Sequence, residues 1–206
     1  EHWLTETNLN KFDMFNDYFT FGCSAMNKSI ESGILRGRPF GGVLTMINNN
    51  LRKITETIFC CDRFAITKVA NLVIVNVYLP CSGTENRLLI CQDLFADILA
   101  RCELYSDCKL IIAGDFNVDL NVVNNDVATF INDVMSEHDL VRCDQLFNKL
   151  NIPTYRNAGL NCQSCIDYIM TSSAQIILNY DVLDPLINFS DHVPILCVCN
   201  VDLTNN

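Results

Sequence analysis

The run from Leu72 to Leu79 constrains the fold more than any other stretch, because Leu72-Val73-Ile74-Val75 is apolar on both faces of a strand. Such a strand is stable where both sides of its sheet are covered, so we expect it to be central. Further short apolar runs have the length and residue types of strands: Gly42–Ile47, Glu56–Cys60, Lys109–Ala113, Ser164–Met170, Gln175–Val182 and Val193–Val201.

Two segments have helical periodicity instead. Leu88 to Cys102 places apolar side chains on one stripe, and Asp126 to His138 does the same, with Asp126 as the expected N-cap. Many strands with a few interspersed helices favour sheets that pack on each other and are covered by helices.

The composition is that of a globular protein. With 206 residues, 50% of them hydrophobic and 18% charged, the chain has enough material for one substantial domain. No repeat or long linker divides it, so we expect a single domain over residues 1–206. No apolar stretch approaches the roughly 18 to 20 residues that a membrane span needs, and no secretory leader opens the chain. These features predict an intracellular protein, nuclear or cytoplasmic, with no membrane partner.

The charge balance limits the partners. A net charge of -10, from 14 basic and 24 acidic residues, argues against a strong non-specific nucleic-acid binder. It does not exclude a nuclease, because carboxylates that bind a metal add negative charge at the site itself. One basic loop, Gly33–Pro39, is open to two interpretations, a phosphate contact and an ordinary solvated loop. The first makes Arg36 and Arg38 candidate substrate-binding residues.

Twelve cysteines suggest either a secreted disulfide framework or buried free thiols. Disulfide frameworks usually compensate for the small core of a chain of under about 100 residues. Here Cys197 and Cys199 lie in an apolar run, so we interpret most cysteines as small buried hydrophobes. Cys162 and Cys165 form a lone CxxC, and without a second pair at matching spacing the sequence does not favour zinc there.

The stretch Gly114-Asp115-Phe116-Asn117 follows the run Lys109–Ala113. Residues two apart on a strand face the same side, so Asp115 and Asn117 are expected to point together while Phe116 packs the other way. Gly, Asp and Asn are also common turn residues, so this stretch alone leaves a turn and a functional site equally open.

Other polar residues stand at strand ends or breaks. Tyr78 precedes Pro80, Asp167 interrupts an apolar strand, and Asp191-His192 precedes the last run. Each has a structural interpretation, such as a turn cap or a surface histidine, but a carboxylate beside an imidazole with further carboxylates elsewhere is the equipment for metal-assisted hydrolysis. Carboxylates hold a hard cation such as Mg²⁺, and a histidine exchanges protons near neutral pH, more readily where a carboxylate orients it.

Four stretches, in this order, resemble the endonuclease/exonuclease/phosphatase superfamily: VNVYLP at 75–80, IIAGDFN at 111–117, CIDYIM at 165–170 and FSDHVPI at 189–195. EHWL at 1–4 and GRPFGGV at 37–43 resemble the apurinic-type endonuclease domain of LINE-like non-LTR retrotransposons. The resemblance covers essentially the whole chain. It implies a four-layer α/β sandwich of two packed mixed β-sheets flanked by helices.

The resemblance also implies roles for the residues that match its motifs. Glu1 and Asp191 would bind the metal ion, Mg²⁺ with Mn²⁺ as the alternative. Asp115 would position or deprotonate the attacking water, while Asn117 and Tyr78 would hold the scissile phosphate.

Two further roles follow from the same resemblance. His192, oriented by Asp167, would act as a base or as an electrostatic clamp on the phosphate, and Thr154 would lie near that phosphate. The implied activity is a Mg²⁺-dependent DNA endonuclease that leaves a 3′-hydroxyl and a 5′-phosphate, the hydroxyl priming reverse transcription. DNA is the implied partner, together with the element's own reverse transcriptase and RNA.

One departure from the family lies at the start. The family opens with a strand bearing an Asn and a second strand leading into the metal-binding Glu, whereas this chain opens at Glu1. We therefore expect a domain that lacks its first strands and is weakly active or inactive as it stands.

Two other functions stay open. One is a phosphatase or phosphodiesterase of the same fold that acts on inositol phosphates or lipids; the other is an inactive retroelement remnant. Cys165-Ile166-Asp167-Tyr168 differs from the Cys-Asp-Arg stretch of inositol phosphatases, which weighs against the first.

Overall fold

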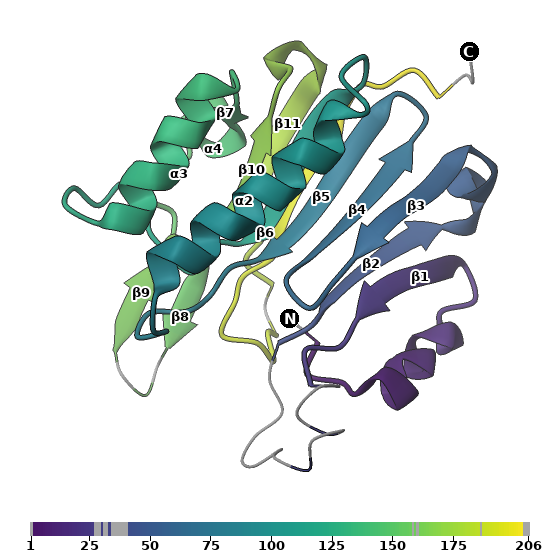
Figure 1. Ribbon diagram of the computed structural model, residues 1–206, viewed down its shortest axis with the longest axis horizontal. Coiled ribbons are helices and arrows are strands. Elements are labelled where there is room, and N and C mark those ends of the chain that lie inside the picture. The colour runs from purple at the N-terminus through teal and green to yellow at the C-terminus, as the bar shows by residue number, and fades with distance from the viewer. Residues whose placement is uncertain are drawn as a thin grey trace. The chain divides into compact units, whose positions relative to one another are not determined.

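The computed structural model describes residues 2–26, 30, 33, 41–157, 159, 161–185 and 187–203. The chain divides into two compact units, one of Glu1–Tyr78 with Asp202–Asn206 and one of Leu79–Val201 (Figure 1). The expectation of a single domain stays a prediction, and the two units are described one at a time.

The first unit consists of strands and 3₁₀ helices: η1 (Glu6–Met14), β1 (Tyr18–Cys23), β2 (Val43–Asn48), η2 (Asn49–Ile54), β3 (Thr55–Cys60), β4 (Phe64–Val69) and β5 (Leu72–Tyr78). β1 pairs antiparallel with β2, and β3, β4 and β5 follow one another in an antiparallel meander. β2 packs against β4 and β5, where the Asn76 Nδ2 atom donates to the Leu44 carbonyl at 2.9 Å. This unit is therefore one sheet packed on another.

The apolar run that begins at Leu72 forms β5 and is covered on both sides, as predicted. Leu72 and Val73 point to opposite faces of the strand, and both are buried. The neighbouring strand β4 is buried in the same way, with Phe64, Ala65 and Ile66 at 1% exposure or less.

The second unit mixes helices and strands: α2 (Arg87–Glu103), β6 (Lys109–Asp115), α3 (Asp126–Glu137), β7 (Val141–Arg142), α4 (Cys143–Leu146), β8 (Tyr155–Asn157), β9 (Cys162–Ser164), β10 (Asp167–Thr171), η3 (Ala174–Ile176), β11 (Ile177–Val182) and β12 (Ile195–Cys199). β10 pairs antiparallel with both β6 and β7. β8 pairs with β9, and β11 with β12. The β6–β10 ladder carries the residues of the candidate site.

The two long helices of this unit match the segments with predicted helical periodicity. α2 and α3 lie side by side (Figure 1), and the ring of Phe95 on α2 meets that of Phe130 on α3 edge-on at 5.8 Å. The predicted N-cap of α3 was wrong by one residue. Asn125 caps the helix, because its extended backbone lets the side chain accept from the amides of Val127 and Ala128, whereas Asp126 is already helical.

The twelve cysteines form no disulfide, as interpreted from the sequence, but the expectation that most of them are buried was wrong, since seven are only partly buried. Cys91, Cys143 and Cys165 are buried, whereas Cys81 and Cys162 are exposed. None of the described helices has the length and apolar character needed to cross a membrane.

Candidate active site

Two carboxylates face each other across the β6–β10 ladder. The antiparallel register pairs Asp115, the last residue of β6, directly with Asp167, the first residue of β10. Their side chains are 13% and 14% exposed. Like charges in directly opposite positions destabilise a sheet, so this pair needs a compensating group.

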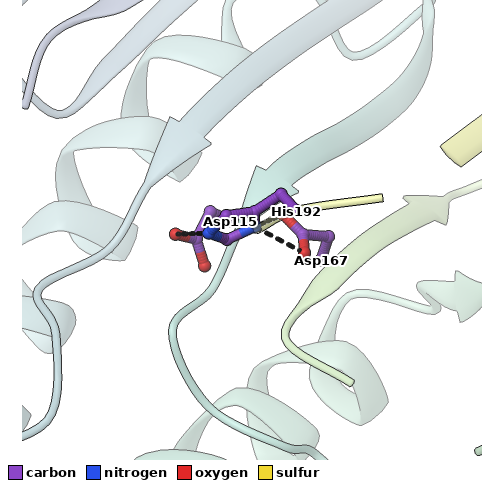
Figure 2. Close-up of side chains that lie close together, drawn as sticks. All are labelled: Asp115, Asp167 and His192. Carbon is purple, nitrogen blue, oxygen red and sulfur yellow. Dashed lines mark hydrogen bonds and ion pairs between the residues drawn. The ribbon is translucent and has the colours of Figure 1, made fainter. Parts of the chain in front are cut away.

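His192 supplies that group. Its Nδ1 atom lies 3.1 and 3.0 Å from the two carboxylate oxygens of Asp167. An ionised carboxylate accepts and does not donate, so Nδ1 carries the proton of this hydrogen bond. On the other side of the ring, Nε2 lies 4.0 Å from Oδ2 of Asp115. The imidazole therefore lies between the two carboxylates (Figure 2).

The surroundings shift the pKa of Asp115 and the pKa of His192. Burial and the charge of Asp167 raise the pKa of Asp115 to about 7, although the Asn117 amide and His192 act in the opposite direction. The hydrogen bond to Asp167 raises the pKa of His192 against the effect of burial. A carboxylate with a pKa near neutrality is suited to general base catalysis, since it can take up a proton at working pH without being permanently charged.

Asn117 meets Asp115 through a turn. The two side chains point together, as predicted, but a turn and not strand alternation brings them together, because β6 ends at Asp115 and Asn117 has a φ of 54°. Its amide donates to Oδ1 of Asp115 at 2.7 Å, and its Nδ2 donates to Oδ2 at 3.0 Å and to the Leu79 carbonyl at 2.9 Å. Both side-chain hydrogens are thus engaged, and the carboxamide holds Asp115 in place.

Phe116 packs away from the site, as predicted. Its ring is fully buried and lies edge-on against Tyr168 at 5.7 Å, and its amide donates to the Ile166 carbonyl at 2.8 Å. The residue between Asp115 and Asn117 therefore fixes the turn to the interior of the unit.

Arg87 was not found from the sequence. As the first residue of α2, it donates from Nε to the Pro80 carbonyl at 2.8 Å and from Nη2 to the Asn117 carbonyl at 2.7 Å. The guanidinium thereby ties two loops together at the end of β6, a function that requires its forked geometry. No local sequence pattern marks such a residue.

Thr154 and Tyr155 lie beside the Asp167–His192 pair. Thr154 is 2% exposed, and its hydroxyl oxygen accepts hydrogen bonds from the backbone amides of Ile166 and Asp167. The ring of Tyr155, which the sequence did not point to, lies edge-on to the imidazole at 5.1 Å. Asp191, by contrast, is exposed next to His192.

The other predicted site residues belong to the first unit or lie outside the described residues. Tyr78 ends β5 in the first unit, where the Arg63 guanidinium lies 5.0 Å from the centre of its ring. Glu1, Arg36 and Arg38 lie outside the described residues.

A metal ion has suitable ligands in this region. Asp115, Asp167 and His192 each offer one ligand atom, and these atoms lie within 4.8 Å of one another. Two carboxylates suit a hard divalent cation, and the exposed Asp191 directly precedes His192 in the sequence. The donor set therefore fits a divalent cation, although each of the three clustered side chains also bonds to a neighbour.

The residues that carry this geometry lie within a stretch that matches a known family. The model of the endonuclease-reverse transcriptase family matches residues 72–196. This chain belongs to that family. The family match includes Asp115, Asp167 and His192, and the resemblance to the endonuclease/exonuclease/phosphatase superfamily is confirmed.

Solved structures share the fold. An AP endonuclease from Archaeoglobus fulgidus superposes with a TM-score of 0.67 at 16% identity, over 98% of this chain and 87% of that one. A 3′-5′ exonuclease (NExo) from Neisseria meningitidis superposes with a TM-score of 0.68 at 14% identity, over 96% and 86%. These similarities confirm the predicted α/β sandwich for this member of the family. No curated protein matches the chain significantly.

Proposed function

We propose that the chain is a divalent-metal-dependent DNA endonuclease that hydrolyses a phosphodiester bond and leaves a 3′-hydroxyl. The observation that carries this proposal is the line Asp167–His192–Asp115, in which one imidazole is bonded to a buried carboxylate and faces a second one 4.0 Å away. Membership of the endonuclease-reverse transcriptase family supports the same activity.

Each residue of this line has a task in the hydrolysis. Asp167 holds the Nδ1–H of His192, which fixes the ring and favours its charged form. The Nε2–H of the imidazolium then stabilises negative charge on the phosphate. Asp115, with a pKa raised to about 7 by burial and by Asp167, takes the proton of the attacking water. As the water oxygen bonds to phosphorus, the bond from phosphorus to the 3′ oxygen breaks, and that oxygen takes a proton from solvent to become the 3′-hydroxyl.

Asn117 and Asp191 complete the proposed site. Asn117 keeps the Asp115 carboxylate oriented through its amide and side-chain donors. Asp191 and Glu1 are the proposed metal ligands, because the carboxylates of Asp115 and Asp167 are bonded to Asn117 and His192; Mg²⁺ is the expected ion and Mn²⁺ the alternative. A bound divalent cation would offset the charge of the phosphate.

The setting of this activity follows from the same family. A 3′-hydroxyl at the nick can prime reverse transcription, so the proposed partners are target DNA and the element's reverse transcriptase with its RNA. A nuclear or cytoplasmic location accords with these partners.

Nicking of supercoiled plasmid tests the proposal. Purified protein with Mg²⁺ is expected to convert supercoiled into open-circular DNA slowly, in line with the weak activity expected from the sequence, and EDTA is expected to stop the reaction. His192→Ala should abolish nicking, whereas His138→Ala, at an exposed histidine that follows α3, should leave it unchanged. A DNA polymerase should extend the nick without any end treatment if the product carries a 3′-hydroxyl.

The same preparation distinguishes the alternative functions. Release of phosphate from inositol phosphates without plasmid nicking would favour a phosphatase of this fold. Folded protein that is inert on both substrates would favour a remnant without catalysis. Equal nicking by wild type and His192→Ala would point to a contaminating nuclease and overturn the proposal.

A further inference from the structure

Thr154 connects the two segments that carry Asp167 and His192. It precedes β8 and is 2% exposed. Its Oγ1 atom accepts from the amide of Ile166 at 3.1 Å and from the amide of Asp167 at 3.0 Å. The hydroxyl therefore binds the backbone of Asp167 itself, at the point where β10 begins.

The backbone of Thr154 also makes hydrogen bonds to the segment before Asp167 and to the segment that contains His192. Its amide donates to the Ser164 carbonyl at 3.1 Å, and its carbonyl accepts from the amide of Val193 at 2.6 Å. Next to it, the backbones of Tyr155 and His192 form an isolated antiparallel bridge. One residue thus spans from the strand of Asp167 to the segment of His192, which are 25 positions apart in sequence.

The position of Thr154 disfavours a direct phosphate contact. A hydroxyl that binds a phosphate must present its hydrogen to solvent or to a site, but this one is buried and faces two amide donors. If the hydroxyl is removed, two partly buried amides lose their acceptor. The backbone at Asp167 must then move to find new partners, and the hydrogen bonds of 3.0 and 3.1 Å to His192 move with it.

We propose that Thr154 is a positioning residue that sets the geometry of the Asp167–His192 pair. This inference rests on the proposed nuclease function for its kinetic consequence, but the geometry can be measured without any substrate. In this role Thr154 helps to align the imidazole of His192 and does not bind the phosphate.

Thr154→Val and Thr154→Ser separate the hydroxyl from the rest of the side chain. Valine keeps the shape without the acceptor, and kcat for plasmid nicking should fall on the order of 10- to 100-fold because the Asp167–His192 pair is displaced. KM should stay within about twofold, since no substrate contact is lost. Serine keeps the acceptor and should retain kcat within about threefold.

Thr171→Val is the matched control. Thr171 is also buried on β10, at its other end, and its hydroxyl accepts from the amide of Ser173 at 3.0 Å. This variant also removes a buried hydroxyl from the same strand, but it should leave kcat and KM unchanged. A merely structural role for Thr154 would make the two valine variants alike.

A second readout is independent of activity. The Nδ1–H of His192 should give a downfield proton resonance that is absent in His192→Ala. We expect this resonance in wild type, Thr154→Ser and Thr171→Val, and we expect it to be lost or shifted in Thr154→Val. If Thr154→Val does not fold, Thr154→Cys replaces it, because a thiol is a weaker acceptor and should give an intermediate shift.

The outcomes are distinct. A protein without nicking activity refutes the proposed function, while the resonance still decides the inference about Thr154. An unchanged resonance in Thr154→Val, or in Thr154→Cys where it stands in, overturns the inference. So does a raised KM at constant kcat, which would show a direct substrate contact.

Discussion

Asp115 and Asp167 stand directly opposite each other across the β6–β10 ladder, and only the imidazole of His192 separates their charges among the described side chains. Two carboxylates in this arrangement resist being ionised together. Asp115 therefore binds a proton more tightly in the folded protein than in the unfolded chain.

The stability of the protein should depend on pH through Asp115. The folded-state pKa of about 7 lies above the ordinary value of 3.8, so the folded protein binds this proton more tightly than the unfolded chain does. The resulting stabilisation is complete below the ordinary value and is lost as the pH rises through about 7. Without divalent cations, Asp115→Asn should therefore gain on the order of 3 kcal/mol relative to wild type between about pH 4 and about pH 8.

Denaturant unfolding at several pH values measures this gain. The exposed Asp93 on α2 gives the control variant Asp93→Asn, whose stability should follow wild type at every pH. The quantity to compare is the slope of the free energy of unfolding against pH. The weaker hydrogen bonds to Asn117 in the variant lower that free energy by an amount that does not depend on pH. If the free energy of unfolding of Asp115→Asn and of wild type varied with pH in parallel, the raised pKa would not belong to Asp115.

Asp167→Asn should impair turnover more than binding. An amide can accept from Nδ1 through one oxygen only, carries no charge to favour the imidazolium, and can also donate to the ring and reverse its tautomer. We expect kcat for nicking to fall on the order of 10²- to 10⁴-fold. Steady-state kinetics beside Asp133→Asn, an exposed position on α3, give the comparison. A loss confined to KM would assign Asp167 to substrate binding instead.

Arg87→Lys should destabilise the end of β6. The guanidinium donates to the carbonyls of both Pro80 and Asn117, and a single ammonium cannot satisfy both in the same geometry. We expect a loss of about 1 to 2 kcal/mol in the free energy of unfolding.

Arg101→Lys on the same helix is the control for this prediction. Arg101 pairs with Asp97 at 2.8 Å, with both side chains more than a third exposed. Its replacement should cost less than about 0.5 kcal/mol. Equal losses for the two lysine variants would show that the Arg87 bridge contributes no more than a surface ion pair.

Thr67→Val should stabilise the first unit. Thr67 on β4 is 1% exposed, and its hydroxyl has no hydrogen-bond partner among the described residues. Removing an unsatisfied buried hydroxyl should raise the free energy of unfolding by about 1 kcal/mol. Thr171→Val removes a bonded hydroxyl and should have the opposite sign, so equilibrium denaturation of both variants checks the cause.

The apolar runs predicted much of the fold, but strands with polar residues or partly exposed faces were not predicted from the sequence. β5 and β6 were predicted because a buried strand needs a continuous apolar run. β4 was missed because Thr67 and Lys68 interrupt it, and β8–β9 because both strands are short and partly exposed. In these elements the pairing partner, and not the local sequence, decides the conformation.

The site divides in the same way. The chemical types of Asp115, Asp167 and His192 were visible in the sequence, but their distances depend on the β6–β10 register and on Thr154. The donors of Asn117 were assigned to a phosphate, whereas in the folded chain the Leu79 carbonyl and Asp115 occupy them. These hydrogen bonds could not be predicted, because the loops that carry Leu79 and Asn117 come into contact only in the folded chain.

The position of Asp115 and Asn117 depends on the buried side chain of Phe116. Its ring lies in the interior of the unit and its amide is bonded to Ile166, so the turn that presents Asp115 and Asn117 is anchored by a residue that meets neither water nor substrate. In a map of all single substitutions scored by DNA cleavage, position 116 would stand out as sharply as its two neighbours. Three sensitive positions in a row would suggest three residues that contact substrate, although the middle one acts through the packing of its ring and one backbone hydrogen bond.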